Sequence, residues 1–304
     1  MVARLRNIAR ERGMSVEAAR DHFVREAFLR RLVASPFAGD FVLKGSVLLL
    51  AWFREFHRPT MDADFLVRTP MSSDDLCAAL MTIIAIPEDD LVLFDAHSLR
   101  MEAMQEDRTM LGYRISIAGG LGSGSLLFRA DIGFTDVVTP QPGMVSLDGL
   151  MAGSITLLGS TVVTVIAEKY DAMVDRGAFN TRMKDYFDLA TLARRQAFSG
   201  HELTSAVRAT FANRGRKMPT RWDERLDALP GDARQQQLWA TFLKEIGKTD
   251  FGTLGQVIAE IRVMLEEPLR HVEPDRQFVK AWRPGIGWGQ ASQSTPVDSA
   301  APTF

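Results

Sequence analysis

The stretch HRPTMDADFL, residues 57–66, places two aspartates inside an otherwise apolar run. Acidic and apolar residues alternate across 62–67, which predicts a β-strand. Asp62 and Asp64 would then lie on one face of that strand, with the apolar side chains on the other. Neighbouring carboxylates repel each other unless a cation lies between them. The pair is therefore either part of a metal site or a solvated pair on an exposed strand.

The segments on either side of this strand favour the metal site. Upstream, FVLKGS (41–46) predicts a strand that turns at Gly45 and Ser46 into a helix, where backbone N–H groups can approach a phosphate closely. Downstream, FRADIGF (128–134) predicts a second strand with Asp131 on its polar face. Carboxylate ligands favour Mg²⁺ or Mn²⁺, and Mg²⁺ is often held together with the phosphates of a substrate. The three segments together predict a site for a metal and a nucleoside triphosphate.

The chain divides into a mixed half and a helical half near Pro140. Helices are predicted over 161–177, 183–197, 200–213 and 252–270, with one or two more within 220–246. Before Pro140, predicted helices alternate with predicted strands: helices 15–34, 46–53 and 73–85, and strands 40–43, 62–67, 90–96, 111–118 and 125–134. We therefore expect an α/β (α+β) fold with a mixed sheet and a mostly helical second lobe. The expected domains are 1–140 and 141–283, followed by a disordered tail, 284–304, rich in Gly, Ser, Gln and Pro.

The helical half contains a second group of charged residues. Lys169 falls on the apolar stripe of the helix predicted over 161–177. Its ammonium either extends to water or points into a cleft, where it would bind a triphosphate as a point charge. Further along, Arg182 and Asp185, and Asp185 and Asp188, are three residues apart and share a helix face. Alone, these pairs are also consistent with ordinary surface ion pairs.

Composition limits the class of protein. The 304 residues carry a formal net charge of −2, and the single cysteine, Cys77, excludes a framework of intramolecular disulfides. The charge is uneven, because 62–107 holds eleven acidic and two basic residues, whereas 176–234 holds twelve basic and seven acidic residues. The basic segment is either a surface for a polyanion or a solvated helical surface.

No part of the sequence predicts a membrane span or a secretory signal. The longest apolar run, residues 41–53, is interrupted by Lys44 and is shorter than the roughly 18 residues that a spanning helix needs. The first fifteen residues lack the apolar core of a signal peptide. We therefore expect a cytoplasmic protein without a membrane partner.

The order of these motifs resembles that of a known family, the AbiEii/AbiGii nucleotidyltransferase toxins, which include the mycobacterial MenT toxins. The resemblance rests on AFLRRLVASPFAGDFVLKGSVLLLAWF, HRPTMDADFL, FRADIGF, AEKYDAMVDRG and NTRMKDYFDL, and runs from about residue 20 to about residue 200. Phe187 stands where a tyrosine is common, and Ser46 where glycine or alanine is common. Residues 215–304 show no resemblance that explains them.

The resemblance implies roles for individual residues. It implies nucleotide contacts by glycine, hydroxyl and basic residues: Lys44, Gly45, Ser46, Arg58, Thr60, Arg182 and Lys184. It implies catalytic roles for Asp62, Asp131, Lys169, Asp185 and Asp188. It implies Mg²⁺ or Mn²⁺ ligation by Asp62, Asp64 and Asp131.

The resemblance also implies a function: a type IV toxin that transfers a nucleoside monophosphate from a nucleoside triphosphate to an acceptor. In relatives the acceptor is the 3′ end of tRNA, and its modification blocks translation. A cognate antitoxin would be encoded beside the toxin. Two alternatives remain open at this point: transfer to a small molecule or a protein side chain, and a non-catalytic nucleotide- or RNA-binding protein. The sequence does not name the nucleotide, the acceptor or the oligomeric state.

Overall fold

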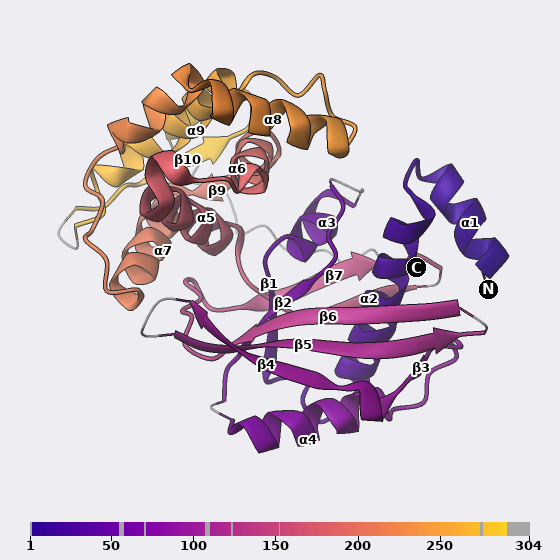
Figure 1. Cartoon of the computed structure of the whole chain (residues 1–304). Helices are drawn as coiled ribbons and strands as arrows, with labels where there is room; N and C mark the ends of the chain where they lie inside the picture. Colours follow the sequence, from indigo (N-terminus) through magenta and orange to yellow (C-terminus); the bar gives the residue numbers. More distant parts are fainter. Residues whose placement is uncertain are drawn as a thin grey trace.

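The computed structural model of the chain describes residues 2–54, 58–69, 71–106, 110–122, 124–151, 153–273 and 276–290. Figure 1 shows two lobes. The sheet lobe contains α1 to α4 and β1 to β8, and the helical lobe contains α5 to α9 and β9 to β11. The predicted mixed α/β fold with a helical second lobe is confirmed.

The described residues of the sheet lobe form an eight-stranded mixed sheet. Its order is β3-β5-β6-β2-β1-β8-β7, and β4 pairs with β5 along the same edge as β3. β2 runs parallel to β6 and β1 parallel to β8, whereas the remaining neighbours are antiparallel. The strands are β1 (Phe41–Lys44), β2 (Ala63–Val67), β3 (Leu93–Phe94), β4 (Arg100–Glu106), β5 (Met110–Leu121), β6 (Gly124–Gly133), β7 (Gly143–Asp148) and β8 (Ser154–Gly159).

Helices cover one face of this sheet. They are α1 (Val2–Glu11), α2 (Val16–Ala34), α3 (Val47–Phe53) and α4 (Ser73–Ile84), with a short 3₁₀ turn, η1 (Ala96–Ser98). α2 begins after Ser15, whose side chain accepts a hydrogen bond from a backbone N–H of the first turn. On α2, Phe28 stacks on Phe128 with the ring centroids 4.1 Å apart and also contacts Phe65. This apolar layer fixes which faces of β2 and β6 are buried, and leaves Asp64 on the other face.

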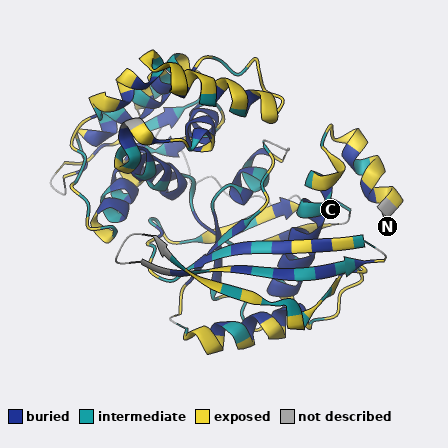
Figure 2. Cartoon of the chain, in the orientation of Figure 1, coloured by how far each residue is buried: buried dark blue, intermediate teal, exposed yellow. Residues whose placement is uncertain are grey.

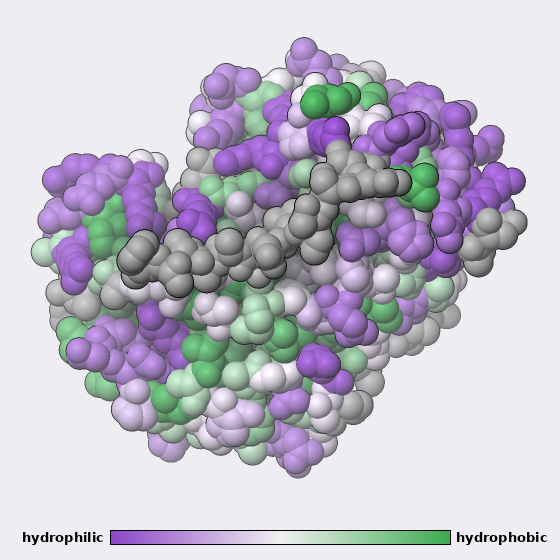
Figure 3. All heavy atoms as spheres, turned by 180° about the vertical axis from the view of Figure 1, so that it is seen from behind, coloured by the Kyte–Doolittle hydropathy of each residue, from purple (hydrophilic) through white to green (hydrophobic). Residues whose placement is uncertain are grey.

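The helical lobe packs around α6 and α9. Its elements are α5 (Val162–Arg176), η2 (Gly177–Phe179), α6 (Met183–Arg195), β9 (Phe198–Ser199), α7 (Gly200–Asn213), η3 (Glu224–Gly231), α8 (Ala233–Glu245), α9 (Leu254–Leu269), β10 (Lys280–Arg283) and β11 (Gly287–Gln290). Figure 2 shows buried residues on the inward sides of these helices and exposed residues outside. From behind, Figure 3 shows hydrophilic residues spread over much of this lobe, at upper right, and over α1, at left.

The sheet and the start of the tail extend further than the sequence indicates. β7 and β8 follow Pro140 but pair with each other, and β8 joins β1, so the sheet does not end at the expected boundary. In the tail expected to be disordered, β11 pairs with β10, because Trp282 and Trp288 pack against Phe198. Residues 291–304 lie outside the described residues, and the division into domains stays a prediction.

None of the helices in the described residues is long and apolar enough to cross a membrane.

Candidate active site

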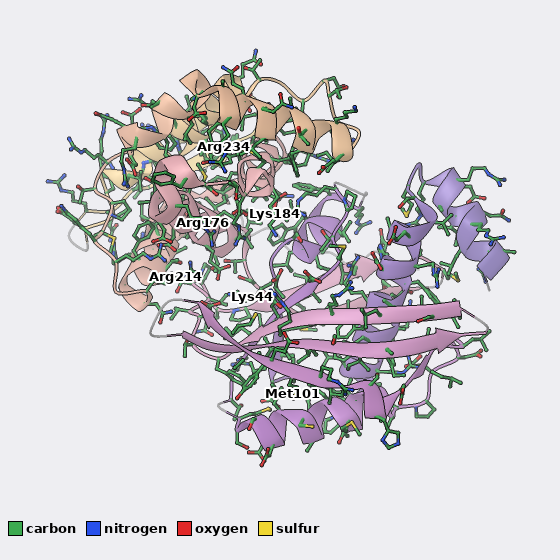
Figure 4. The ribbon with its side chains drawn as sticks, viewed as in Figure 1. Lys44, Met101, Arg176, Lys184, Arg214 and Arg234 are labelled. Carbon is green, nitrogen blue, oxygen red and sulfur yellow. The ribbon has the colours of Figure 1, made fainter. Side chains whose placement is uncertain are left out.

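An open cleft with a volume of about 1070 Å³ lies between the two lobes. Figure 4 shows Lys44 of the sheet lobe and Arg176, Lys184 and Arg214 of the helical lobe where the lobes meet. All the residues that the resemblance implicates line this cleft except Asp188. Those that line it are Lys44, Gly45, Ser46, Arg58, Thr60, Asp62, Asp64, Asp131, Lys169, Arg182, Lys184 and Asp185.

Gly45 makes room for Asp64. β1 and β2 are antiparallel, and Lys44 lies opposite Asp64, so the turn that follows β1 passes beside the Asp64 side chain. Gly45 has a φ of +64°, and a Cβ added to it would lie 1.9 Å from Asp64 Oδ2. A side chain at position 45 would therefore be strained and would collide with the carboxylate. The glycine that we predicted as part of a phosphate-binding turn also positions the acidic pair.

Asp64 lies opposite Asp131 on the parallel neighbours β2 and β6. Burial raises the pKa of Asp64, and the negative charge of Asp131 raises it further, against the opposing effect of nearby lysines. Asp62 lies just before β2, also on the cleft. Carboxylates that repel each other are suited to a divalent cation, and the predicted Mg²⁺ or Mn²⁺ ligands Asp62, Asp64 and Asp131 all line this cleft.

Asp131 is held by an arginine that the sequence did not single out. Arg114 on β5 lies directly opposite Asp131 on β6. Its Nε and Nη2 donate to the two carboxylate oxygens at 2.9 and 2.8 Å. Among the described residues, no group of three or more His, Cys, Asp or Glu side chains is arranged to hold a metal ion. The three predicted ligands, Asp62, Asp64 and Asp131, line one cleft. The carboxylate of Asp131, however, is hydrogen-bonded to Arg114.

Lys44 is buried in an ion-pair network. Its ammonium contacts Asp136, and it lies 2.7 Å from Glu168 Oε1 on α5. Burial alone would lower the pKa of Lys44, but these two carboxylates raise it above its ordinary value. The two carboxylates therefore take two of the three N–H donors of the ammonium, which leaves one donor for the expected contact with a phosphate.

Asp188 lies behind the cleft and joins both lobes. Its carboxylate accepts two hydrogen bonds at 2.8 Å from Arg58, which precedes β2, and its Oδ2 lies 2.7 Å from Lys169 Nζ. Burial alone would raise the pKa of Asp188, but Arg58 and Lys169 hold it well below its usual range. Asp188 is therefore a buried anion that orients two cations.

Asp185 lies beside this cluster and holds the same lysine. Its Oδ1 accepts a hydrogen bond from Lys169 at 3.0 Å, and its Oδ2 accepts one from Arg182 at 2.7 Å. Lys169 thus lies between two carboxylates of α6 and lines the cleft. The predicted helix-face pair of Arg182 and Asp185 is present, as part of a larger buried network.

Two cleft cations have no partner among the described residues. Neither the side chain of Arg176, at the end of α5, nor that of Lys184, on α6, forms a hydrogen bond or ion pair with any residue in the described ranges. Burial, and then the charges of Arg182 and Arg58, lower the pKa of Lys184. Both side chains line the cleft, where they can interact with an anion.

Several cleft residues were missed by sequence reasoning: Arg114, Asp136, Glu168, Arg176, Arg214 and Arg216. Glu168 directly precedes the predicted Lys169, so its position offered a signal. Arg176 lies near the end of the quoted motif AEKYDAMVDRG but was not singled out. The other four stand outside the recognised motifs, and only the fold brings them to the cleft.

Comparison with known proteins identifies the family of the chain. The family of nucleotidyl transferase AbiEii toxins of type IV toxin–antitoxin systems matches residues 27–256, which is more than half of the chain. The chain belongs to the AbiEii toxin family. The match confirms the resemblance and extends it past residue 200. Membership of this family makes the chain a nucleotidyltransferase toxin, implies an antitoxin as partner and a nucleoside triphosphate as substrate, and is generally accompanied by a divalent metal.

A solved structure shares this fold. A candidate nucleotidyltransferase from H. pylori is 15% identical with a TM-score of 0.52, covering 84% of this chain and 96% of that one. JHP933 from Helicobacter pylori is also 15% identical, with a TM-score of 0.47, covering 84% and 93% of the two chains. No curated protein matches the chain.

Proposed function

We propose that this toxin transfers a nucleoside monophosphate from a nucleoside triphosphate to the 3′ end of tRNA, and so blocks translation in the cytoplasm. The observation that supports this most is the arrangement of the cleft. It places the acidic residues Asp62 and Asp64 on one wall, and on the other Arg176 and Lys184, whose side chains form no ion pair with any residue that the structure describes. A triphosphate and a polyanionic acceptor both need such charges.

The sheet lobe supplies the nucleotide side of this proposal. Asp62 and Asp64 would hold Mg²⁺ against the triphosphate, and a bound Mg²⁺ would neutralise phosphate charge and orient the leaving group. Gly45 and Ser46 would contact the phosphates, and Ser46 is held beside the acidic pair because its hydroxyl lies 3.1 Å from that of Thr60. Arg58, also on the cleft, is fixed by Asp188.

In this proposal Asp131 accepts the proton of the acceptor and Lys169 stabilises the leaving group. The acceptor hydroxyl gives its proton to Asp131, its oxygen bonds to the α-phosphorus, and pyrophosphate leaves. Lys169 stabilises the negative charge that develops on pyrophosphate, since Asp185 and Asp188 hold its ammonium in a fixed position. Asp131 must be released from Arg114 before it accepts the proton.

The helical lobe supplies the acceptor side. Arg176 and Lys184 line the cleft, and Arg182 adds a third cation whose side chain is 37% exposed. Lys and Arg side chains that neutralise phosphates provide most of the sequence-independent affinity for nucleic acid. A small-molecule acceptor would not need this row of cations.

An in vitro transfer assay tests the proposal. Purified protein and its Asp62→Ala variant are each incubated with total tRNA, Mg²⁺ and one of four α-labelled nucleoside triphosphates. With the wild type we expect labelled tRNA. With Asp62→Ala we expect the rate of labelling to fall by about 10³-fold or more, because a metal clamp contributes several kcal/mol to catalysis.

The same assay separates the alternatives. Label on protein or on small molecules, with none on RNA, would overturn tRNA as the acceptor while retaining nucleotidyl transfer. Equal labelling by wild type and Asp62→Ala would overturn the role of the acidic pair. The cognate antitoxin, encoded beside the toxin, is expected to abolish toxicity, whether or not it binds the toxin stably.

A further inference from the structure

Arg114 lies among acidic side chains of the cleft. Its guanidinium donates two hydrogen bonds to Asp131. These hydrogen bonds and the charge of Asp131, together with the charges of Asp62 and Glu102, raise the pKa of Arg114. A cation in this position screens the repulsion that Asp131 imposes on Asp64. In the nucleotide-free protein, the positive charge of Arg114 therefore neutralises part of the negative charge that these carboxylates would otherwise present to a metal or a triphosphate.

The Arg114–Asp131 pair is more exposed than the Arg58–Asp188 pair, which lies behind the cleft. The Arg114 side chain is 55% exposed and that of Asp131 is 26% exposed. In the Arg58–Asp188 pair the corresponding values are 8% and 0%. Solvent-exposed ion pairs contribute little free energy, whereas breaking a buried pair leaves an uncompensated charge. Breaking the Arg114–Asp131 pair therefore costs less free energy than breaking the Arg58–Asp188 pair.

Only small or flexible groups border Arg114 on this face of the sheet. The next pair along β5 and β6 is Gly112 with Gly133, neither of which has a side chain. The methyl group of Met104 on β4 lies over Gly112, 3.3 Å from where a Cβ atom would be, and a methionine side chain changes rotamer readily. All of these residues line the cleft. A change of the Arg114 rotamer, with a shift of Met104, would carry the guanidinium off Asp131 and over the region beside Asp62 without moving the strand.

We propose that Arg114 is a cation that exchanges between two anions: it holds Asp131 in the nucleotide-free site and transfers to the triphosphate when the nucleotide binds. This inference rests on the proposed function. The exchange releases Asp131 for the metal and for the acceptor proton only when a nucleotide is present. It links assembly of the catalytic acids to substrate binding, because the anion that attracts Arg114 is the substrate itself.

The proposal predicts opposite effects on two ligands. Without nucleotide, Arg114 competes with a divalent cation for Asp131, so its removal strengthens metal binding. Without metal, Arg114 contributes a positive charge to the phosphate site, so its removal weakens binding of a polyphosphate. A residue that only supports the fold would weaken both.

The experiment compares wild type, Arg114→Gln and the control Arg100→Gln on the full-length protein. Arg100 lies on the adjacent strand β4 and, among the described residues, donates only to the backbone carbonyls of His97 and Leu99. Mn²⁺ is titrated without nucleotide and followed by electron paramagnetic resonance. Inorganic tripolyphosphate is titrated without metal and followed by calorimetry, which avoids the question of which base is preferred.

For Arg114→Gln we expect Mn²⁺ affinity to rise about tenfold and tripolyphosphate affinity to fall about tenfold, the scale of one nearby charge. Arg100→Gln is expected to change neither by more than about twofold. Unchanged or weaker Mn²⁺ binding by an Arg114→Gln variant with wild-type Tm would overturn the exchange. Neither titration requires catalysis, so failure to label tRNA would leave this result standing, and failure here would leave the transfer assay valid.

Discussion

Gly45 shows how one residue without a side chain controls the acidic pair. Replacement by alanine would place Cβ 1.9 Å from Asp64 Oδ2 at a φ of +64°. We expect Gly45→Ala to lower the free energy of unfolding by about 2 kcal/mol, because of the left-handed backbone and the collision. We expect transferase activity to fall by roughly 10²-fold or more, because a misplaced catalytic group loses its geometry. Thermal unfolding and the labelling assay measure both effects.

The matched control is Gly13→Ala. Gly13 has nearly the same backbone, with a φ of +63°, but no heavy atom lies within 4 Å of the added Cβ. This variant is expected to lose about 1 kcal/mol of stability from backbone strain alone and to keep its activity. Similar activity in Gly45→Ala and Gly13→Ala would show that displacement of Asp64 does not matter.

At the scale of elements, Asp188 on α6 forms ion pairs with Arg58, which precedes β2, and with Lys169 on α5. We expect Asp188→Asn to lower the free energy of unfolding at pH 7 by about 3–5 kcal/mol, because the buried Arg58 loses its anion and Lys169 keeps Asp185 but loses Asp188. The folded pKa of Asp188 is depressed, so its contribution is complete above the ordinary aspartate pKa of about 4 and is lost as the pH falls below it. Denaturation at several pH values measures the difference.

An exposed pair provides the comparison for that measurement. Arg194 and Glu260 also form a two-bond pair, at 2.7 and 2.9 Å, but their side chains are 33% and 39% exposed. Glu260→Gln is expected to cost less than about 1 kcal/mol. If Asp188→Asn costs no more than Glu260→Gln, or if its cost is the same at pH 7 and at pH 3, Asp188 is not the structural anion described above.

At the scale of the whole molecule, the proposed function requires a chain with a net charge of −2 to bind RNA through its basic segment, residues 176–234. We expect Lys184→Ala to weaken tRNA binding and to reduce the salt dependence of log Kd by about one unit of slope, because one phosphate contact is lost. Arg234→Ala is the control, since Arg234 on α8 lies away from the cleft (Figure 4). Fluorescence anisotropy at several salt concentrations measures the slope. Equal slopes for both variants would contradict an acceptor site in the cleft.

Local patterns in the sequence were enough to predict much of the candidate site. Alternation with period two placed Asp62 and Asp64 near a strand, and spacing of three placed Arg182 beside Asp185 on a helix. These predictions succeed because strand and helix geometry relate residues that are close in the chain. The order of the motifs also predicted the family, which the match over 27–256 confirms.

Pairing across the fold was decided only by the tertiary structure. Arg58 meets Asp188 across 130 positions, and Arg114 meets Asp131 because β5 and β6 pair in one register. Shifting that register by one residue would turn one partner to the other face of the sheet. The sequence by itself determined which residues carry charge and which faces they share. The tertiary structure decided which charges meet and which stay free, since ion pairs form through contacts that no local spacing specifies.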